Sequence, residues 1–209
     1  MSIAEPDAGH AALRAEKKAL RARILASRDR LDPAIRLKHS RIITEKLLAL
    51  PTYRDAGTVS AYASIGSEFD TSAFVAAILA AGKRLLLPRI NRAARALELR
   101  LVGNPATDLV AGVWGIREPS DKCALVPASD VGFVLVPGVA FTASGERIGY
   151  GGGFYDRLLA ELDPAVPRIA AAFDLQLVDS LPTGSQDQRV HRVVTEVGDG
   201  DGRRVMGDE

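Results

Sequence analysis

A glycine-rich segment between an arginine and an aspartate has the residue types best suited to chemistry. Arg147 is followed by four glycines, namely Gly149, Gly151, Gly152 and Gly153. Glycines let backbone N–H groups approach a ligand closely, and a following helix start adds partial positive charge. Arg147 could donate paired hydrogen bonds to a phosphate or carboxylate, and Asp156 could hold a magnesium ion against the same phosphates. The segment is therefore a candidate phosphate-binding loop.

The loop does not match the standard nucleotide-binding motifs. The sequence contains no G-x-x-x-x-G-K-[ST] motif, and Phe154 stands where the dinucleotide-binding motif starting at Gly149 requires a glycine. A turn that merely connects a strand to a helix could contain the same glycines. Both interpretations remain open at this level.

Charged residues elsewhere could meet the same ligand. Lys17 and Arg21 are four residues apart on a predicted helix, so they share a face that could neutralise a triphosphate or simply be solvated. Glu68 follows a predicted strand, where it could contact a ligand or favour the next helix start. Asp187 could complete a metal site with Asp156, or could be an ordinary exposed loop aspartate.

The remaining reactive side chains give weaker signals. Trp114, the one tryptophan in the sequence, could stack on an aromatic ligand or pack in the core. His10, His39 and His191 lack metal-ligand spacing, and together with the single Cys123 they indicate neither a zinc site nor a Cys–His nucleophile. The absence of a G-x-S-x-G motif argues against a hydrolase.

The composition limits the class of protein. A chain of 209 residues, 47% hydrophobic and 25% charged, can bury a core without disulfides and is not a disordered chain. With 27 basic and 26 acidic side chains, the formal charge of +1 argues against broad nucleic-acid or membrane binding. No segment has the pattern of an export signal or a membrane span. We therefore expect a cytoplasmic protein that binds neither nucleic acid nor membranes. We also expect it to be a monomer.

The spacing of apolar residues predicts one α/β domain over residues 11–197, with disordered ends at 1–10 and 198–209. Two N-terminal helices are expected, at 11–28 and from Pro33 to just before Pro51, the second capped by Asp32. A strand at 58–63, a helix from Asp70 to Ala81 and a strand at 83–87 that stops at Pro88 predict a right-handed parallel crossover. The remaining expected elements are strands at 97–101, 131–136, 168–173 and 191–197 and a helix at 154–162. We expect a single three-layer domain, in which helices cover both faces of a mostly parallel central sheet, together with the N-terminal helical pair.

Five segments together resemble the 5-formyltetrahydrofolate cyclo-ligase family, also called methenyltetrahydrofolate synthetases. The strongest is PGVAF followed after five residues by RIGYGGGFYD, at residues 137–156. The other four occur in the family's order: Lys17-x-x-Leu20-Arg21, Glu68-Phe-Asp-Thr71, Trp114-x-Ile116-x-x-Pro119 and Asp187-x-x-Val190. The chain departs from the family pattern at Phe154, where a tyrosine is commoner, at Gly152, where some members carry lysine, and at His191, where many carry an acid.

The resemblance implies an ATP- and Mg²⁺-dependent ring closure that converts 5-formyltetrahydrofolate to 5,10-methenyltetrahydrofolate, ADP and phosphate through a phosphorylated formyl group. It implies catalytic roles for Arg147 and Tyr155, and Mg²⁺ ligation by Asp156 and Asp187. Its implied folate contacts are Ile65, Glu68, Trp114, Tyr150 and Tyr155. Its implied ATP contacts are Lys17, Arg21, Arg147, Ile148, Gly149, Tyr150, Gly151, Gly152, Gly153, Phe154 and Tyr155.

Two alternatives belong to other functional classes. The departures at Gly152 and His191 are compatible with a folate- or nucleotide-binding relative that does not turn its ligands over. An enzyme of sugar phosphates or coenzyme A on a similar sheet is also conceivable, but it leaves the Lys17–Arg21 pair unexplained.

Overall fold

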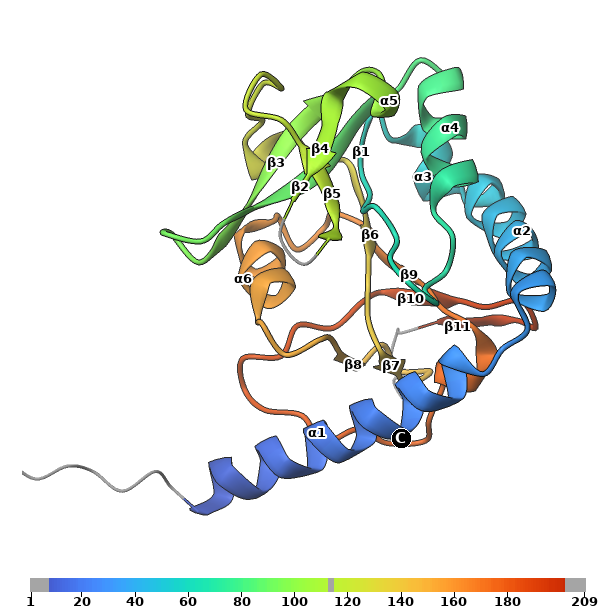
Figure 1. The fold of residues 1–209 in the computed structure, drawn as a ribbon, viewed down its shortest axis with the longest axis vertical. Helices are drawn as coiled ribbons and strands as arrows, with labels where there is room; N and C mark the ends of the chain where they lie inside the picture. The colour runs from blue at the N-terminus through green and yellow to red at the C-terminus, as the bar shows by residue number, and fades with distance from the viewer. Residues whose placement is uncertain (1–7, 113–114, 202–209) are drawn as a thin grey trace, which may run out of the picture.

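A twisted seven-stranded sheet forms the centre of the computed structural model, which describes residues 8–112 and 115–201 (Figure 1). The strand order is β11-β10-β9-β6-β1-β2-β3. The five inner strands are parallel, and each edge strand is antiparallel to its neighbour. The sheet strands are β1 (Thr58–Ser60), β2 (Arg84–Asn91), β3 (Ala96–Val102), β6 (Phe133–Val136), β9 (Arg168–Ala171), β10 (Arg192–Val194) and β11 (Asp199–Asp201).

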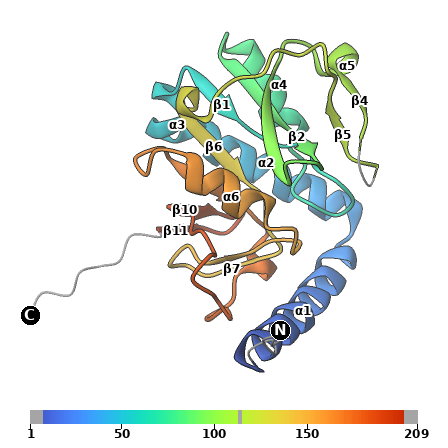
Figure 2. The ribbon, with the colours of Figure 1, turned by 90° about the vertical axis from the view of Figure 1, so that its left-hand side faces the viewer.

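Helices cover both faces of this sheet, as predicted. They are α1 (Ala8–Asp29), α2 (Pro33–Ala49), α3 (Pro51–Asp55), α4 (Ser72–Ala80), α5 (Pro105–Asp108) and α6 (Phe154–Glu161), with short 3₁₀ segments η2 (Ala128–Asp130) and η3 (Asp174–Gln176). Two small antiparallel pairs lie outside the sheet: β4 (Leu109–Ala111) with β5 (Arg117–Pro119), and β7 (Ala140–Phe141) with β8 (Arg147–Ile148). Figure 2 shows α6 in front of β6, with α2 behind it.

The central strand β6 shows why the sheet needs helices on both faces. Phe133 and Leu135 pack in the core formed with α2, α3 and α4, whereas Val134 and Val136 pack in the core that contains Leu158 of α6. All four strand residues are buried, as the uninterrupted apolar run predicts for a strand covered on both faces.

The predicted end of β2 at Pro88 is wrong, because the strand continues to Asn91. The Ala61 N–H donates to the Leu86 carbonyl, so even-numbered residues of β2 turn their backbone groups toward β1. Since β1 ends at Ser60, opposite Leu86, no sheet bond of β1 is lost where Pro88 lacks its N–H. Antiparallel pairing with β3 carries β2 onward.

The predicted ends of other elements also change. The first strand stops at Ser60 rather than at residue 63, and the last parallel strand spans only Arg192–Val194. The expected disorder at 1–10 and 198–209 is wrong for residues 8–10, which begin α1, and for 199–201, which pair with β10. The Asp32 cap is confirmed, because its carboxylate accepts from the N–H groups of Ala34 and Ile35.

Two crossovers of opposite direction define where a ligand can bind. The β1–α4–β2 unit moves toward one edge of the sheet with its helix on one face, while β6–α6–β9 moves toward the other edge with its helix on the opposite face. The neighbouring strands β1 and β6 therefore form a switch point, and open α/β sheets bind ligands beyond the carboxyl ends of such strands. The helix α1 lies along this edge, where Ile24 packs with residues of β7 and β8 (Figure 1).

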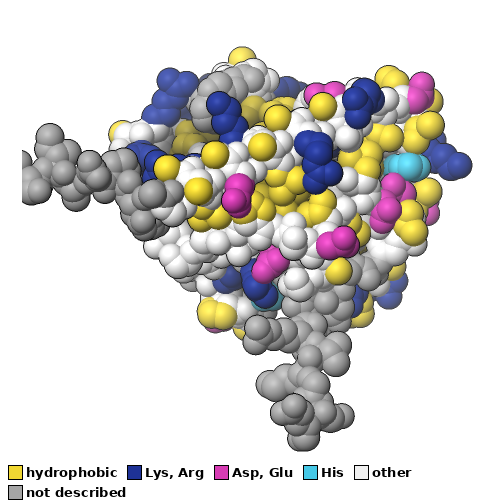
Figure 3. All heavy atoms as spheres, turned by 90° about the horizontal axis from the view of Figure 1, so that it is seen from below, with side chains coloured by type: hydrophobic (Ala, Val, Ile, Leu, Met, Phe, Trp, Pro, Cys, Tyr) yellow, Lys and Arg dark blue, Asp and Glu magenta, His cyan; other side chains and the backbone are white. Residues whose placement is uncertain are grey.

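Figure 3 views the molecule from this α1 side and shows basic side chains close to acidic ones instead of one continuous basic area. In residues 8–112 and 115–201, no helix is long and apolar enough to cross a membrane.

Candidate functional site

A cavity of about 900 Å³ opens at the switch point between β1 and β6. Its walls come from the segments that follow β1 and β6, from strands β2, β3 and β5, from the glycine-rich loop, from the start of α6, and from α1. The structure places fifteen of the predicted site residues in its lining: Lys17, Arg21, Ile65, Glu68, Arg147, Ile148, Gly149, Tyr150, Gly151, Gly152, Gly153, Phe154, Tyr155, Asp156 and Asp187. The sixteenth, Trp114, lies outside the described residues.

The glycine-rich loop connects β8 to α6 and needs glycine for its backbone path. Gly151 has φ of 99° and Gly153 has φ of 65°, both in the left-handed region that disfavours residues with a Cβ atom. Gly153 is the N-cap of α6, and Asp156 lies in the first turn of that helix. The Arg21 Nε donates to the Gly149 carbonyl at 2.8 Å, so α1 holds the loop directly. The loop therefore closes one end of the cavity.

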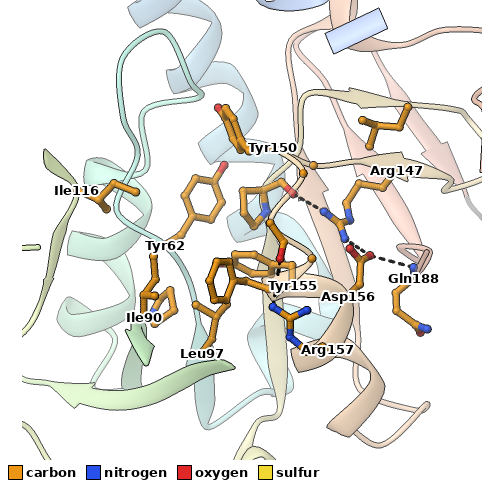
Figure 4. A pocket seen from close by; sticks show the side chains of 18 of the residues that line it. Tyr62, Ile90, Leu97, Ile116, Arg147, Tyr150, Tyr155, Asp156, Arg157 and Gln188 are labelled. Atoms are coloured by element: carbon orange, nitrogen blue, oxygen red, sulfur yellow. Dashed lines mark hydrogen bonds and ion pairs between the residues drawn. The ribbon is translucent and has the colours of Figure 1, made fainter. Parts of the chain in front are cut away.

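Two ion pairs form what we call the cation–carboxylate side of the cavity: Lys17 with Asp187, and Arg147 with Asp156. Arg147 Nη2 lies 2.6 Å from Asp156 Oδ1, and Lys17 Nζ lies 2.5 Å from Asp187 Oδ2. Each carboxylate also accepts from a backbone N–H, that of Gln188 for Asp156 and that of Gly184 for Asp187. Figure 4 shows Arg147, Asp156 and Gln188 together on one side of the cavity. Two cations and two carboxylates thus share this wall.

Arg147 is the most buried member of this group, with 2% of its side chain exposed. Its guanidinium also donates to the Pro137 carbonyl at the end of β6. Within the described part of the chain, its buried Nε has no hydrogen-bond partner. A buried donor without a partner costs free energy, so this cation is suited to an additional acceptor supplied by a ligand.

The carboxylates here suit a metal that arrives with a ligand. Among residues 8–112 and 115–201, no group of three or more His, Cys, Asp or Glu side chains is placed to hold a metal ion. Mg²⁺ usually takes one or two protein carboxylates and completes its shell with phosphate oxygens and water. Asp156 and Asp187 therefore fit a magnesium ion shared with a nucleotide, and their assignment as ligands stays a prediction.

A second part of the cavity is formed by Tyr62, Glu68, Tyr150 and Tyr155, which we call the tyrosine–glutamate wall. Glu68 is 7% exposed, and its carboxylate accepts from the Tyr150 hydroxyl at 2.5 Å and from the Ile65 N–H at 2.9 Å. Burial raises the pKa of Glu68, while these two hydrogen bonds and the charge of Arg28 act in the opposite direction. Figure 4 shows Tyr62 and Tyr150 on the side away from Asp156.

The three phenols of this wall are held in their protonated form. Burial, and secondarily the nearby Glu68 charge, raises the pKa of Tyr62, Tyr150 and Tyr155. They can therefore donate hydrogen bonds and offer aromatic faces at neutral pH, but they are not general bases. This wall can orient a planar polar ligand.

Tyr62 and Arg157 are among the lining residues that the sequence prediction missed. Tyr62 falls in the segment predicted as a strand end, where a buried aromatic reads as ordinary core. Arg157 donates to the carbonyls of Gly152 and Arg95, and its guanidinium lies 5.1 Å from the centre of the Phe154 ring. In the sequence, the one sign that Arg157 could line the site is its position directly after Asp156 in the predicted helix.

The two departures from the family pattern have different surroundings. A Cβ atom on Gly152 would lie 2.8 Å from the ring of Phe154, so a larger residue there would require that ring to move. Arg157 supplies a cation beside this glycine. His191 is not in the cavity lining, and its ring nitrogen accepts from the Arg168 N–H at the start of β9.

Comparisons with known proteins agree on one family. A model of the 5-formyltetrahydrofolate cyclo-ligase family matches residues 13–196. The protein named 5-formyltetrahydrofolate cyclo-ligase from Mycolicibacterium smegmatis is 34% identical over 185 residues, which cover 86% of this chain and 93% of that protein. Its namesake from Escherichia coli K12 is 34% identical over 152 residues, covering 72% and 84%.

Solved structures give the same result. The solution structure of a 5,10-methenyltetrahydrofolate synthetase from Aquifex aeolicus superposes with a TM-score of 0.81 at 32% identity, covering 92% of this chain and 96% of that one. A synthetase from Mycoplasma pneumoniae, 22% identical with a TM-score of 0.71, has the same fold.

Proposed function

Since the chain belongs to the 5-formyltetrahydrofolate cyclo-ligase family and is an enzyme of that family, we propose that it closes 5-formyltetrahydrofolate to 5,10-methenyltetrahydrofolate at the expense of ATP. One observation carries the proposal: a single cavity joins the cation–carboxylate side to the tyrosine–glutamate wall. The first suits a triphosphate and the second a planar polar ring. Both substrates of such a reaction can therefore meet in one cavity.

The chemistry needs activation of a poor leaving group. The formyl oxygen attacks the γ-phosphorus of ATP, the bond to the ADP oxygen breaks, and the formyl carbon becomes electrophilic. N10 then attacks this carbon, loses its proton to solvent, and phosphate leaves with the former formyl oxygen. Phosphoryl transfer of this kind depends on positioning and on charge neutralisation more than on a protein nucleophile.

The cation–carboxylate side would receive the nucleotide. Lys17, Arg21 and Arg147 would contact phosphate oxygens, with backbone N–H groups of the glycine-rich loop beside them. Asp156 and Asp187 would hold Mg²⁺, which when bound would neutralise part of the phosphate charge. Lys17 and Arg147 now pair with these same carboxylates, so nucleotide binding would replace protein ion pairs by pairs with the ligand.

The tyrosine–glutamate wall would receive the folate ring system. Glu68 would accept hydrogen bonds from ring N–H groups, and Tyr150 and Tyr155 would border the ring. Ile65 would add apolar contact beside Glu68. The Ile65 N–H already donates to the Glu68 carboxylate. Tyr155 is the second residue of α6 after the glycine-rich loop, so it would stand close to the atoms that react.

A spectroscopic assay tests the proposal. Purified protein with 5-formyltetrahydrofolate, ATP and Mg²⁺ is expected to produce the near-ultraviolet absorbance of the methenyl product and one equivalent of ADP. Omission of ATP, or its replacement by the β,γ-imido analogue, is expected to abolish the product. Saturable folate binding without product in the complete mixture would refute the enzymatic proposal and favour a binding protein.

We also propose that the enzyme works as a cytoplasmic monomer. The described cavity lining comes from one chain, so the proposed chemistry requires no second copy. Analytical ultracentrifugation with substrates is expected to show one species near 22.2 kDa. Activity confined to a larger species would contradict this part.

A further inference from the structure

Arg28, at the end of α1, is a buried arginine behind the cavity wall. The residue is 3% exposed, and it does not line the cavity. Its Nε donates to the Ser67 hydroxyl at 3.0 Å, and its Nη2 donates to the Tyr150 hydroxyl at 2.9 Å. Ser67 in turn donates to the carboxylate of Asp29. A buried guanidinium is rarely retained without such partners, so its position is fixed by these bonds.

The hydrogen bonds from Arg28 run in one direction. A guanidinium has donors and no acceptor, so the Tyr150 oxygen must accept from Arg28. The phenolic proton is then directed at Glu68, whose Oε1 lies 2.5 Å from the Tyr150 oxygen. Glu68 receives a second bond from the Ile65 N–H at its other oxygen. The chain Arg28, Tyr150, Glu68 therefore ends in a carboxylate that serves as an acceptor beside the cavity.

The charges around Glu68 assign a specific task to Arg28. The groups that face the carboxylate are Arg28 from α1, Tyr62 after β1, Tyr150 from the glycine-rich loop and Tyr155 at the start of α6. Asp29 is linked to this set through Ser67. Burial raises the pKa of Glu68, and the Arg28 charge lowers it. Of the groups named here, Arg28 carries the positive charge.

We propose that Arg28 is a positioning residue for folate: it orients Tyr150 and thereby favours Glu68 as an ionised acceptor at the cavity wall. The inference rests on the proposed function, because it takes the tyrosine–glutamate wall as the folate site. It separates Arg28 from Lys17 and Arg21, which lie on the same helix but contact the Asp187 carboxylate and the Gly149 carbonyl. A positioning role affects folate selectively, whereas loss of the helix would also affect ATP.

Four variants test this role: Arg28→Met, Arg28→Lys, Tyr150→Phe and, as a control, Arg23→Met at an exposed site of α1. A ¹³C NMR titration of the Glu68 carboxyl in the free protein, assigned with Glu68→Gln, is expected to show an upward shift of its pKa in Arg28→Met. The shift should be smaller in Arg28→Lys, which keeps the charge, and absent in Arg23→Met. An unchanged Glu68 titration in Arg28→Met would overturn the proposal.

Kinetics provide the second readout. In Arg28→Met the KM for 5-formyltetrahydrofolate is expected to rise roughly tenfold, as for loss of support to a buried charged group, with the KM for ATP within about twofold of wild type. Adding Arg28→Met to Tyr150→Phe should cause little further loss of folate affinity, because the two changes break one chain of bonds. Equal rises of both KM values, or fully additive losses, would show a merely structural role.

The outcomes separate this inference from the proposed function. If wild-type protein makes no methenyl product, the proposed function fails, while the Glu68 titration still decides the role of Arg28 because it needs no substrate. If Arg28→Met does not fold, Arg28→Lys and Tyr150→Phe decide it instead: each should shift the Glu68 pKa upward, and no shift in either would contradict the proposal.

Discussion

The cation–carboxylate side and the tyrosine–glutamate wall use opposite kinds of interaction within one cavity. On the first side, Lys17 and Arg147 pair with carboxylates that keep 20% and 25% of their side chains exposed. On the second, Glu68 is almost fully buried and is held by a phenol and a backbone N–H. The first wall can exchange its ionic partners with a charged ligand, whereas the second presents a prearranged surface. Each wall should therefore control a different substrate.

Among the variants of the two walls, removal of the Arg147 guanidinium should cause the largest loss of activity. In Arg147→Met, kcat/KM is expected to fall by roughly 10²–10³, the loss typical of a preorganised donor that stabilises developing charge. Steady-state kinetics measure the loss, and thermal unfolding checks that the protein is folded.

The matched control is Arg189→Met, which removes an exposed arginine from a pair with Glu146 outside the cavity lining. That variant should keep normal activity. If folded Arg147→Met keeps more than about a tenth of the wild-type rate, the phosphate-binding role of this wall is wrong.

Lys17 should have the next largest effect, and on ATP alone. In Lys17→Met the KM for ATP is expected to rise roughly tenfold, because a cation is lost and Asp187 keeps an unpaired charge. The KM for folate should not change. Lys18→Met, at the exposed neighbouring position, is the control. A selective rise in the folate KM would reverse the assignment of the two walls.

Glu68→Gln should produce the converse pattern. The KM for 5-formyltetrahydrofolate is expected to rise by about five- to tenfold, because the amide replaces a charged acceptor by a neutral one. The KM for ATP should remain unchanged, as should both constants in Glu161→Gln at an exposed site of α6. Parallel initial-rate series in each substrate make the comparison, and equal effects on both substrates would remove the distinction between the walls.

The distance along the chain between contacting residues explains what the sequence could predict. The glycine-rich loop, Arg147 and Asp156 lie within ten residues, so local conformation places them together and their types suggest phosphate chemistry. The α/β fold class could also be predicted, because a buried strand such as β6 has a continuous apolar run.

Contacts between residues far apart in the chain could not be predicted in this way. Lys17 and Asp187 are 170 positions apart, and only the fold shows that they form a pair. Arg28 reads as part of a basic helix face, and Tyr62 as a core residue, because their partners come from other segments. The continuation of β2 through Pro88 depends on where β1 ends, which no property of Pro88 itself reveals.

The smallest predicted effect concerns stability. Burial raises the folded-state pKa of Glu68 above its ordinary value of 4.5, so its contribution to stability is present below that pH and is lost as the pH rises through the folded-state pKa. Glutamine does not titrate. Urea unfolding at about pH 4 and about pH 7 should therefore show wild type losing stability relative to Glu68→Gln at the higher pH. If wild type instead gained stability relative to Glu68→Gln at the higher pH, the effect attributed to the burial of Glu68 would be contradicted.

The fate of the formyl oxygen tests the central claim most directly. 5-Formyltetrahydrofolate labelled with ¹⁸O in the formyl group is incubated with the enzyme, ATP and Mg²⁺, and the released phosphate is analysed by ³¹P NMR. Activation of the formyl group by ATP in this cavity predicts that ¹⁸O appears in inorganic phosphate, one atom for each methenyl product. Methenyl product accompanied by unlabelled phosphate would contradict it.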